Sequence, residues 1–228
     1  MTKVTAVLLD LDGTLVDTAP DLVGTLNAVL SRAGRTTVAL DRMRNLVSGG
    51  ARGLMRSGFA LTGEALSDDE IESWVPDFLE IYGARLSDGS RPYPGVVDTL
   101  GTLRDGGASL GVCTNKPCGL AERLLDELDL LKWFDALLGG DSLDVRKPNP
   151  RHVEATINAV GGTAPEAIMV GDSIIDVEAA RGARIPVIIV GYGYGIERAR
   201  AGGADAEIAS FSELPRAIAE LGWRGSTG

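Results

Sequence analysis

The sequence is poor in residues on which several classes of protein depend. It has two cysteines in 228 residues, too few for a disulfide-stapled scaffold. Cys113 and Cys118 are therefore expected to be reduced thiols, with Cys113 in a core strand. No apolar run approaches the roughly 18 residues that a membrane-spanning helix needs. The first residues also reach acidic side chains too soon for a signal peptide. These absences predict a cytoplasmic protein with no membrane partner.

Positive charge is scarce as well. Lysine and arginine total 22 against 32 aspartate and glutamate residues, which gives a formal net charge of -10 at pH 7. This excess disfavours nucleic acid as a partner, because phosphate backbones bind basic faces. Small anionic substrates stay possible, since local fields in a cleft outweigh net charge. Lysine occurs only at Lys3, Lys116, Lys132 and Lys147.

Short apolar runs separated by amphipathic stretches indicate the fold class. The runs that predict strands are residues 4–9, 108–113, 135–140, 167–170 and 186–190. Such runs alternating with helices are typical of an α/β fold with a doubly wound, Rossmann-like parallel sheet covered on both faces. Ligands of these sheets bind beyond the carboxyl ends of the strands. The polar turns that follow the runs should meet at that edge.

Residues 17–90 show a different pattern, with amphipathic helices and no strand run. One of these helices should begin with a capping box formed by Ser67 and Glu70. The segment is expected to be a small α-helical domain inserted after the first strand. Residues 1–16 and 91–228 then form the core domain. The last residues, 224–228, are expected to fray.

Two carboxylates end the first predicted strand. Asp10 and Asp12 should project to the same side, because side chains alternate along a strand. Like charges this close are costly unless a cation or a shared proton offsets them. A calcium loop does not fit, since Gly13 comes too soon. A simple turn role for Asp12 is the alternative to a functional site.

The other strand ends carry complementary groups. These groups are Asp172 with Asp176 one helical turn later, Thr114 with Asn115, and Lys147 before a proline turn. Helix capping and solvent exposure are the alternatives for each of them. Together, however, such carboxylates can hold Mg²⁺, while the hydroxyl, amide and ammonium groups can hold a phosphate. One carboxylate can attack phosphorus and a second can transfer the proton.

Four segments in this order resemble motifs of the haloacid dehalogenase superfamily of phosphatases. They are "DLDGTLVDT" from Asp10, "TNK" at 114–116, "RKPNP" around Lys147 and "GDSIIDV" at 171–177. The resemblance covers nearly the whole chain. It implies hydrolysis of a small phosphate monoester through an aspartyl-phosphate. An acid at Asp12 distinguishes the chain from the dehalogenases proper, which lack one there.

The resemblance also implies roles for individual residues. Asp10 would be the nucleophile and Asp12 the general acid and base. Mg²⁺ would be held by the Asp10 carboxylate, the Asp12 main-chain carbonyl and Asp172. Behind these ligands, Asp176 and Ser173 would support the metal site. The phosphoryl group would be bound by Thr114, Asn115 and Lys147.

Residues 17–90 resemble the small cap that selects substrates in this family. Three stretches, 47–55, 146–162 and 190–197, resemble phosphoglycolate phosphatases, and Arg52 could bind the carboxylate of 2-phosphoglycolate. A solvated helix arginine is the alternative for Arg52. The cap segment has no lysine or histidine, which disfavours phosphonate-cleaving and mutase-like relatives. The one histidine, His152, is expected to be a surface or capping residue.

Two other functions stay open. The first is a broad-specificity phosphatase acting on sugar phosphates, nucleotides or pyrophosphate. The second is a catalytically inactive binding module on the same fold, which the filled catalytic positions disfavour. The sequence is compatible with a monomer or a homodimer.

Overall fold

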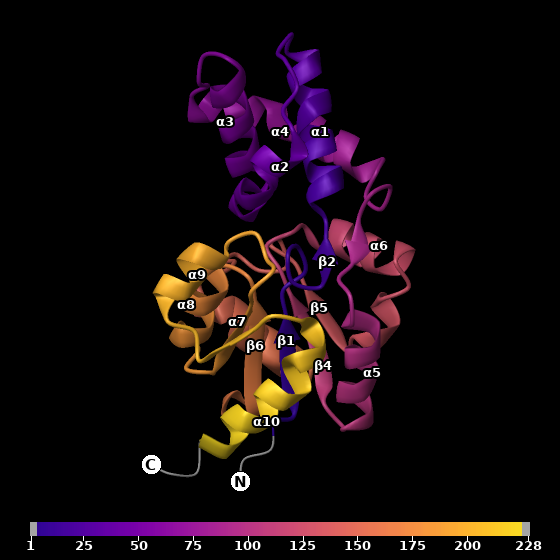
Figure 1. Cartoon of the computed structure of the whole chain (residues 1–228), viewed down its shortest axis with the longest axis vertical. Helices are drawn as coiled ribbons and strands as arrows, with labels where there is room; N and C mark the ends of the chain where they lie inside the picture. Colours follow the sequence, from indigo (N-terminus) through magenta and orange to yellow (C-terminus); the bar gives the residue numbers. More distant parts are fainter. Residues whose placement is uncertain (1–3, 225–228) are drawn as a thin grey trace. The chain divides into compact units, whose positions relative to one another are not determined.

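The computed structural model describes residues 4–224. The chain forms two compact units, one of Met1–Val16 with Pro92–Gly228 and one of Asp17–Arg91 (Figure 1). The expected fraying beyond residue 224 lies outside the described residues. That residues 17–90 act as a separate cap domain stays a prediction.

The first unit is built on a six-stranded sheet in the order β5-β4-β1-β6-β7-β8. The strands are β1 (Ala6–Leu9), β4 (Ser109–Cys113), β5 (Ala136–Leu138), β6 (Ala167–Gly171), β7 (Val187–Val190) and β8 (Ala206–Ile208). All neighbouring strands pair in parallel. The predicted parallel sheet and its five strands are confirmed. The sixth, β8, was not predicted, because this short edge strand has an exposed glutamate, Glu207, at its centre.

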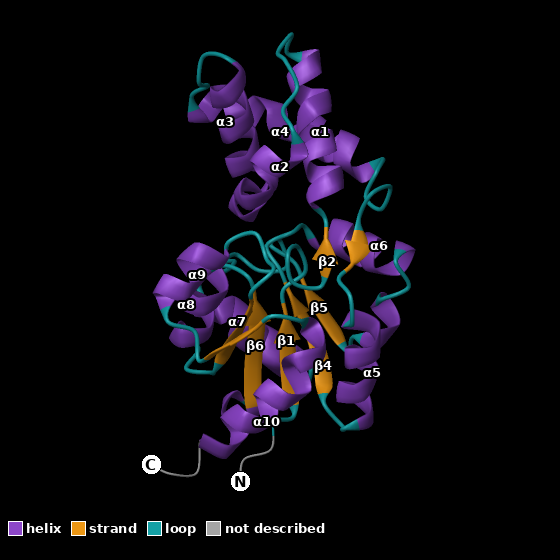
Figure 2. Cartoon of the chain, viewed as in Figure 1, coloured by secondary structure: helices purple, strands orange, loops and turns teal. Residues whose placement is uncertain are grey.

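Helices lie on both sides of this sheet (Figure 2). They are α5 (Val96–Asp105), α6 (Cys118–Glu127), α7 (Pro150–Ala159), α8 (Ile174–Gly182), α9 (Ile196–Gly202) and α10 (Leu214–Arg224). Single 3₁₀ turns are η2 (Leu131–Trp133), η3 (Ala164–Glu166) and η4 (Phe211–Glu213). Alternate residues of β1, Ala6 and Leu8, pack into one core cluster with Val153 and Ile157 of α7. All four β1 residues are fully buried, as expected for a central strand covered on both faces.

The second unit is helical. Its elements are α1 (Ala19–Arg32), α2 (Leu40–Met43), the 3₁₀ helix η1 (Arg44–Gly49), α3 (Gly50–Thr62) and α4 (Asp68–Gly83). The predicted capping box is present at α4, where Ser67 and Glu70 exchange hydrogen bonds. Where the chain passes between the units, β2 (Val16–Asp17) and β3 (Arg91–Pro92) form a two-stranded sheet.

One buried carboxylate closes the helical unit. Asp21, in the first turn of α1, is 1% exposed. It accepts hydrogen bonds from the backbone amides of Gly89 and Ser90 and from the Ser90 hydroxyl, the last at 2.6 Å. Arg85 lies 3.8 Å from the same carboxylate. Asp21 thus joins the first helix of the unit to its last turn.

Candidate active site

The site residues follow three neighbouring strands directly. Asp10 comes after β1, Thr114 after β4 and Asp172 after β6. Because β1 pairs in parallel with both β4 and β6, these three residues share one edge of the sheet. The apolar runs end there because the backbone leaves the covered part of the sheet and polar side chains can meet a ligand.

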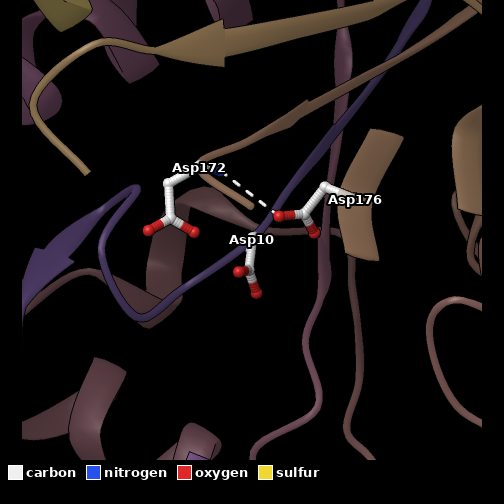
Figure 3. Close-up of side chains that lie close together, drawn as sticks. All are labelled: Asp10, Asp172 and Asp176. Carbon is white, nitrogen blue, oxygen red and sulfur yellow. Dashed lines mark hydrogen bonds between the residues drawn. The ribbon is translucent and has the colours of Figure 1, made fainter. Parts of the chain in front are cut away.

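Three carboxylates meet at this edge. Oxygen atoms of Asp10, Asp172 and Asp176 lie within 4.8 Å of one another, and all three residues are buried. Figure 3 shows them converging from the end of β1, the turn after β6 and α8. Buried carboxylate oxygens at this spacing form a donor set that fits a hard divalent cation such as Mg²⁺.

Burial has a strong effect on this cluster. Burial, with a contribution from the charge of the neighbouring Asp176, raises the pKa of Asp10 to about 6 against the lowering effect of Lys147. Burial, together with the charges of Asp176 and Asp10, also raises the pKa of Asp172 well above its ordinary value. Burial and the repulsion between these acids thus both disfavour their negatively charged forms. A bound cation would supply the missing positive charge.

Lys147 is the ammonium within the cluster. Its Nζ lies 2.9 Å from Asp10 Oδ1 and 2.6 Å from Asp176 Oδ1, and its side chain is 2% exposed. Burial lowers the pKa of Lys147, but the two carboxylates outweigh that effect and raise it above the usual value. The side chain therefore stays charged and holds Asp10 by one oxygen.

Asp176 is bonded through both of its oxygens. Oδ2 accepts hydrogen bonds from the backbone amide of Ser173 at 3.0 Å and from its hydroxyl at 2.6 Å. Oδ1 accepts from Lys147. The bond from the Ser173 amide is part of a capping box at the start of α8. The arrangement suits the supporting roles expected for Asp176 and Ser173, which stay predictions.

Backbone amides of the glycine-rich loop after β7 hold Asp172. The amides of Tyr194 and Gly195 donate to Asp172 Oδ2 at 2.7 and 3.3 Å. A Cβ atom on Gly193 would lie 2.1 Å from the Asp172 Cβ, and one on Gly13 would lie 2.4 Å from its Oδ2. Gly13 also has a φ of +85°, which favours glycine. The glycines are thus needed for the close approach of two loops to one carboxylate.

The groups after β4 are largely engaged within the protein. Thr114 is buried, and its Oγ1 accepts a hydrogen bond from the backbone amide of Lys116 at 3.2 Å. The side-chain amide of Asn115 donates to the main-chain carbonyl of Lys147 at 2.9 Å. Phosphoryl binding by Thr114 and Asn115 stays a prediction. The contact of Asn115 indicates that it positions the Lys147 segment.

Sequence reasoning missed Lys116. Its Nζ lies 2.9 Å from Asp12 Oδ1 and 3.2 Å from Oδ2, and its side chain is 4% exposed. The Asp12 carboxylate therefore faces Lys116, outside the cluster of three carboxylates. Only its main-chain carbonyl was expected to meet the metal, and that expectation stays a prediction. Lys116 follows Thr114 and Asn115 directly, and the rarity of lysine was the one feature that could have identified it.

Two further residues named in the sequence analysis, His152 and Arg52, lie outside the cluster of three carboxylates. His152 was expected at the surface or as a cap, and this is wrong. The side chain is fully buried on α7, whose N-cap is Asn149. In the helical unit, Arg52 binds both oxygens of Glu72, at 2.7 and 2.6 Å, and about half of each side chain is exposed. Contact of Arg52 with a substrate stays a prediction.

The sequence is similar to those of known proteins. The family model described as haloacid dehalogenase-like hydrolase matches residues 7–190. A phosphoglycolate phosphatase of Caulobacter vibrioides is 44% identical over 215 residues, covering 94% of this chain and 91% of that protein. One of Agrobacterium fabrum is 45% identical over 187 residues, covering 82% and 80%.

The fold is also similar to solved structures. The crystal structure of a predicted phosphoglycolate phosphatase from Haemophilus somnus 129pt matches with a TM-score of 0.85 at 28% identity. The match covers 95% of this chain and 98% of that one. The likeness therefore extends over both units of the chain.

Proposed function

This chain belongs to the haloacid dehalogenase-like hydrolase family, and on that premise we propose that it hydrolyses 2-phosphoglycolate to glycolate and phosphate with Mg²⁺. It is a phosphoric monoester hydrolase. The observation that carries the proposal is the buried Asp10 carboxylate, held by Lys147 at 2.9 Å, with a second acid, Asp12, two residues later. A buried nucleophile beside a fixed positive charge suits attack on an anionic phosphoryl group.

The residues have distinct tasks in the proposed mechanism. Asp10 attacks phosphorus and forms an aspartyl-phosphate, while Asp12 gives its proton to the leaving oxygen of glycolate. Asp12 then takes a proton from the water that hydrolyses the aspartyl-phosphate, which returns both acids to their starting state. Lys147 and Thr114 bind the oxygens of the transferred group throughout.

Magnesium would be held by Asp10, the Asp12 main-chain carbonyl and Asp172. When bound, it would offset the charge of the carboxylates and of the phosphoryl oxygens. The two backbone amides on Asp172 Oδ2 fix that side chain in advance. Asp176 Oδ1 lies 2.6 Å from Lys147 Nζ and so fixes the position of the ammonium group. The carboxylates of Asp10 and Asp172 are therefore each held through one oxygen, the first by Lys147 and the second by the two amides.

The substrate is tested by kcat/KM measurements with Mg²⁺ on a panel of phosphorylated metabolites. The panel contains 2-phosphoglycolate, hexose phosphates, nucleotides and pyrophosphate, with EDTA and Asp10→Asn as inactive controls. We expect a preference for 2-phosphoglycolate of about 100-fold, on the order of 3 kcal/mol in transition-state binding. A flat profile would instead favour the broad-specificity phosphatase. Absence of metal-dependent turnover on every compound would favour the inactive binding module.

Arg52 is the proposed contact for the carboxylate of the substrate. Its planar guanidinium can bind a carboxylate through two hydrogen bonds, as it binds Glu72 in the structure. Arg52→Ala should raise KM for 2-phosphoglycolate much more than KM for a neutral aryl phosphate. Equal effects on the two substrates would assign Arg52 to the surface pair with Glu72 alone.

The surroundings of the protein are also part of the proposal. Of the helices in the described residues, none has the length and apolar character needed to cross a bilayer. Both cysteines are free thiols, which fits a reducing compartment such as the cytoplasm. The partner would be a small phosphorylated metabolite. Sedimentation of the purified protein would distinguish a monomer from a homodimer.

A further inference from the structure

We propose that Lys116 is a positioning residue that holds the Asp12 carboxylate in place for proton transfer, and that it thereby determines how well the enzyme expels poor leaving groups. The inference rests on the proposed function of Asp12 as general acid and base. It concerns the second ammonium of the site, whose partner is distinct from that of Lys147.

The geometry of the pair restrains Asp12. One Nζ spans both carboxylate oxygens, at 2.9 and 3.2 Å, so rotation of the carboxylate would break at least one contact. The Lys116 side chain is 4% exposed, whereas that of Asp12 is 24% exposed. The ammonium is thus the buried, fixed partner, and the carboxylate is the more accessible end. An acid that must meet a leaving group needs this combination of restraint and access.

The backbone around Lys116 is itself fixed. Its amide donates to Thr114 Oγ1 at 3.2 Å, and its carbonyl accepts from the amide of Gly140 at 2.9 Å. Gly140 approaches so closely that a Cβ atom there would lie 2.4 Å from the Asn115 carbonyl oxygen. Two residues on, the amide of Cys118 donates to Asp141 Oδ1 at 2.7 Å. The turn after β5 therefore holds the segment that presents Lys116.

The nucleophile and the general acid of the proposed mechanism each contact a different lysine. Lys147 contacts Asp10 and Asp176, and Lys116 contacts Asp12. Among the ion pairs of the described residues, the one with Lys116 is the only one that involves Asp12. Loss of Lys116 should therefore impair the proton transfer that depends on Asp12 while leaving the attack by Asp10 intact.

The dependence of kcat/KM on the leaving group separates a loss of proton transfer by Asp12 from a loss of attack by Asp10. Phosphoryl transfer from 2-phosphoglycolate needs a proton on the departing alkoxide, whereas p-nitrophenolate departs without one. We expect Lys116→Met to lower kcat/KM for 2-phosphoglycolate by about 100-fold, the range of general acid catalysis, and for p-nitrophenyl phosphate by less than about threefold. The matched control is Lys132→Met, whose side chain is 55% exposed and pairs with Asp129. It should leave both values unchanged.

A double-mutant cycle tests the coupling directly. If Lys116 acts through Asp12, Lys116→Met should lower kcat/KM for 2-phosphoglycolate by less than about threefold in an Asp12→Asn background. The double variant also removes both charges of the pair, so it folds without the unpaired buried ammonium or carboxylate that a single substitution leaves. Circular dichroism and the urea midpoint check that each variant is folded.

The outcomes are distinguishable. Equal losses on the two substrates, no loss on either, or additive losses in the cycle would each overturn the positioning role of Lys116. Failure of the proposed function itself would show differently, because the unmodified protein would then not hydrolyse 2-phosphoglycolate at all.

Discussion

Acidification should weaken the core unit through His152. The imidazole is fully buried on α7. Within residues 4–224, neither of its ring nitrogens makes a hydrogen bond of acceptable geometry. Burial, together with the charge of Lys147, lowers the pKa of His152 from 6.5 to about 4 against the opposing carbonyls of Gly139 and Leu138. The folded protein therefore keeps this imidazole neutral under conditions where the unfolded chain protonates it.

The sign and size follow from proton linkage. Between the unfolded pKa of 6.5 and the folded value of about 4, the unfolded chain binds a proton that the folded protein does not. The free energy of unfolding must then fall as pH falls through that window, while above it nothing is lost. Between about pH 7 and about pH 5 the loss from this one group is ~2 kcal/mol.

The assay is urea unfolding in EDTA, compared between the natural chain and His152→Gln. Each protein is measured at about pH 7 and about pH 5. The loss on acidification should be smaller in the variant by about 2 kcal/mol. Asp10, whose pKa is raised, contributes with the opposite sign in both proteins and cancels in the comparison. An identical pH dependence in the two proteins would refute the buried, neutral imidazole.

Two further predictions concern single contacts. Gly193→Ala places a methyl group where Asp172 stands, so Mg²⁺ affinity measured by calorimetry should fall about tenfold or more. The control Gly195→Ala, whose Cβ would lie 3.1 Å from that of Ser173, should lose less affinity. Equal Mg²⁺ affinities of the two variants would contradict the close approach of Gly193 to Asp172. Asp21→Ala leaves the buried amide of Ser90 without its acceptor and should lower the free energy of unfolding by about 2 to 4 kcal/mol in urea. The control Asp77→Ala removes a 41% exposed carboxylate and should cost less than about 0.5 kcal/mol, and a similar cost for both would argue against the Asp21 network.

Much of the fold could be predicted because it depends on local pattern. Apolar runs that stop at a polar residue mark the central strands, and parallel pairing then brings Asp10, Thr114 and Asp172 to one edge whatever the details of packing. The short strand β8 has no such run. It lies at the edge of the sheet and pairs with β7 alone, so its residues are less buried than those of the central strands. Its assignment depends on a neighbour that the local sequence does not reveal.

His152 shows a local pattern that was available and overlooked. On α7 the buried residues are His152, Val153, Thr156 and Ile157. His152 lies one turn before Thr156, as Val153 lies one turn before Ile157, so the histidine belongs to the inward face by helical spacing. The expectation of a surface position treated its polarity as decisive, although a neutral imidazole can be buried at moderate cost.

Lys116 could not be assigned from spacing, because its partner lies on another strand end. Composition, however, contains a clue. With 22 lysines and arginines in total and four of them lysines, the chain uses arginine for most of its positive charge. The arginine side chains in its described ion pairs, such as Arg52 and Arg85, are at least one-third exposed, whereas Lys116 and Lys147 are almost fully buried beside Asp12 and Asp10. A compact ammonium fits between buried carboxylates where a planar guanidinium would need more room. In a chain that otherwise uses arginine, the position of each lysine is therefore informative. Two of the four lysines contact Asp10 and Asp12, the acids that follow the first strand.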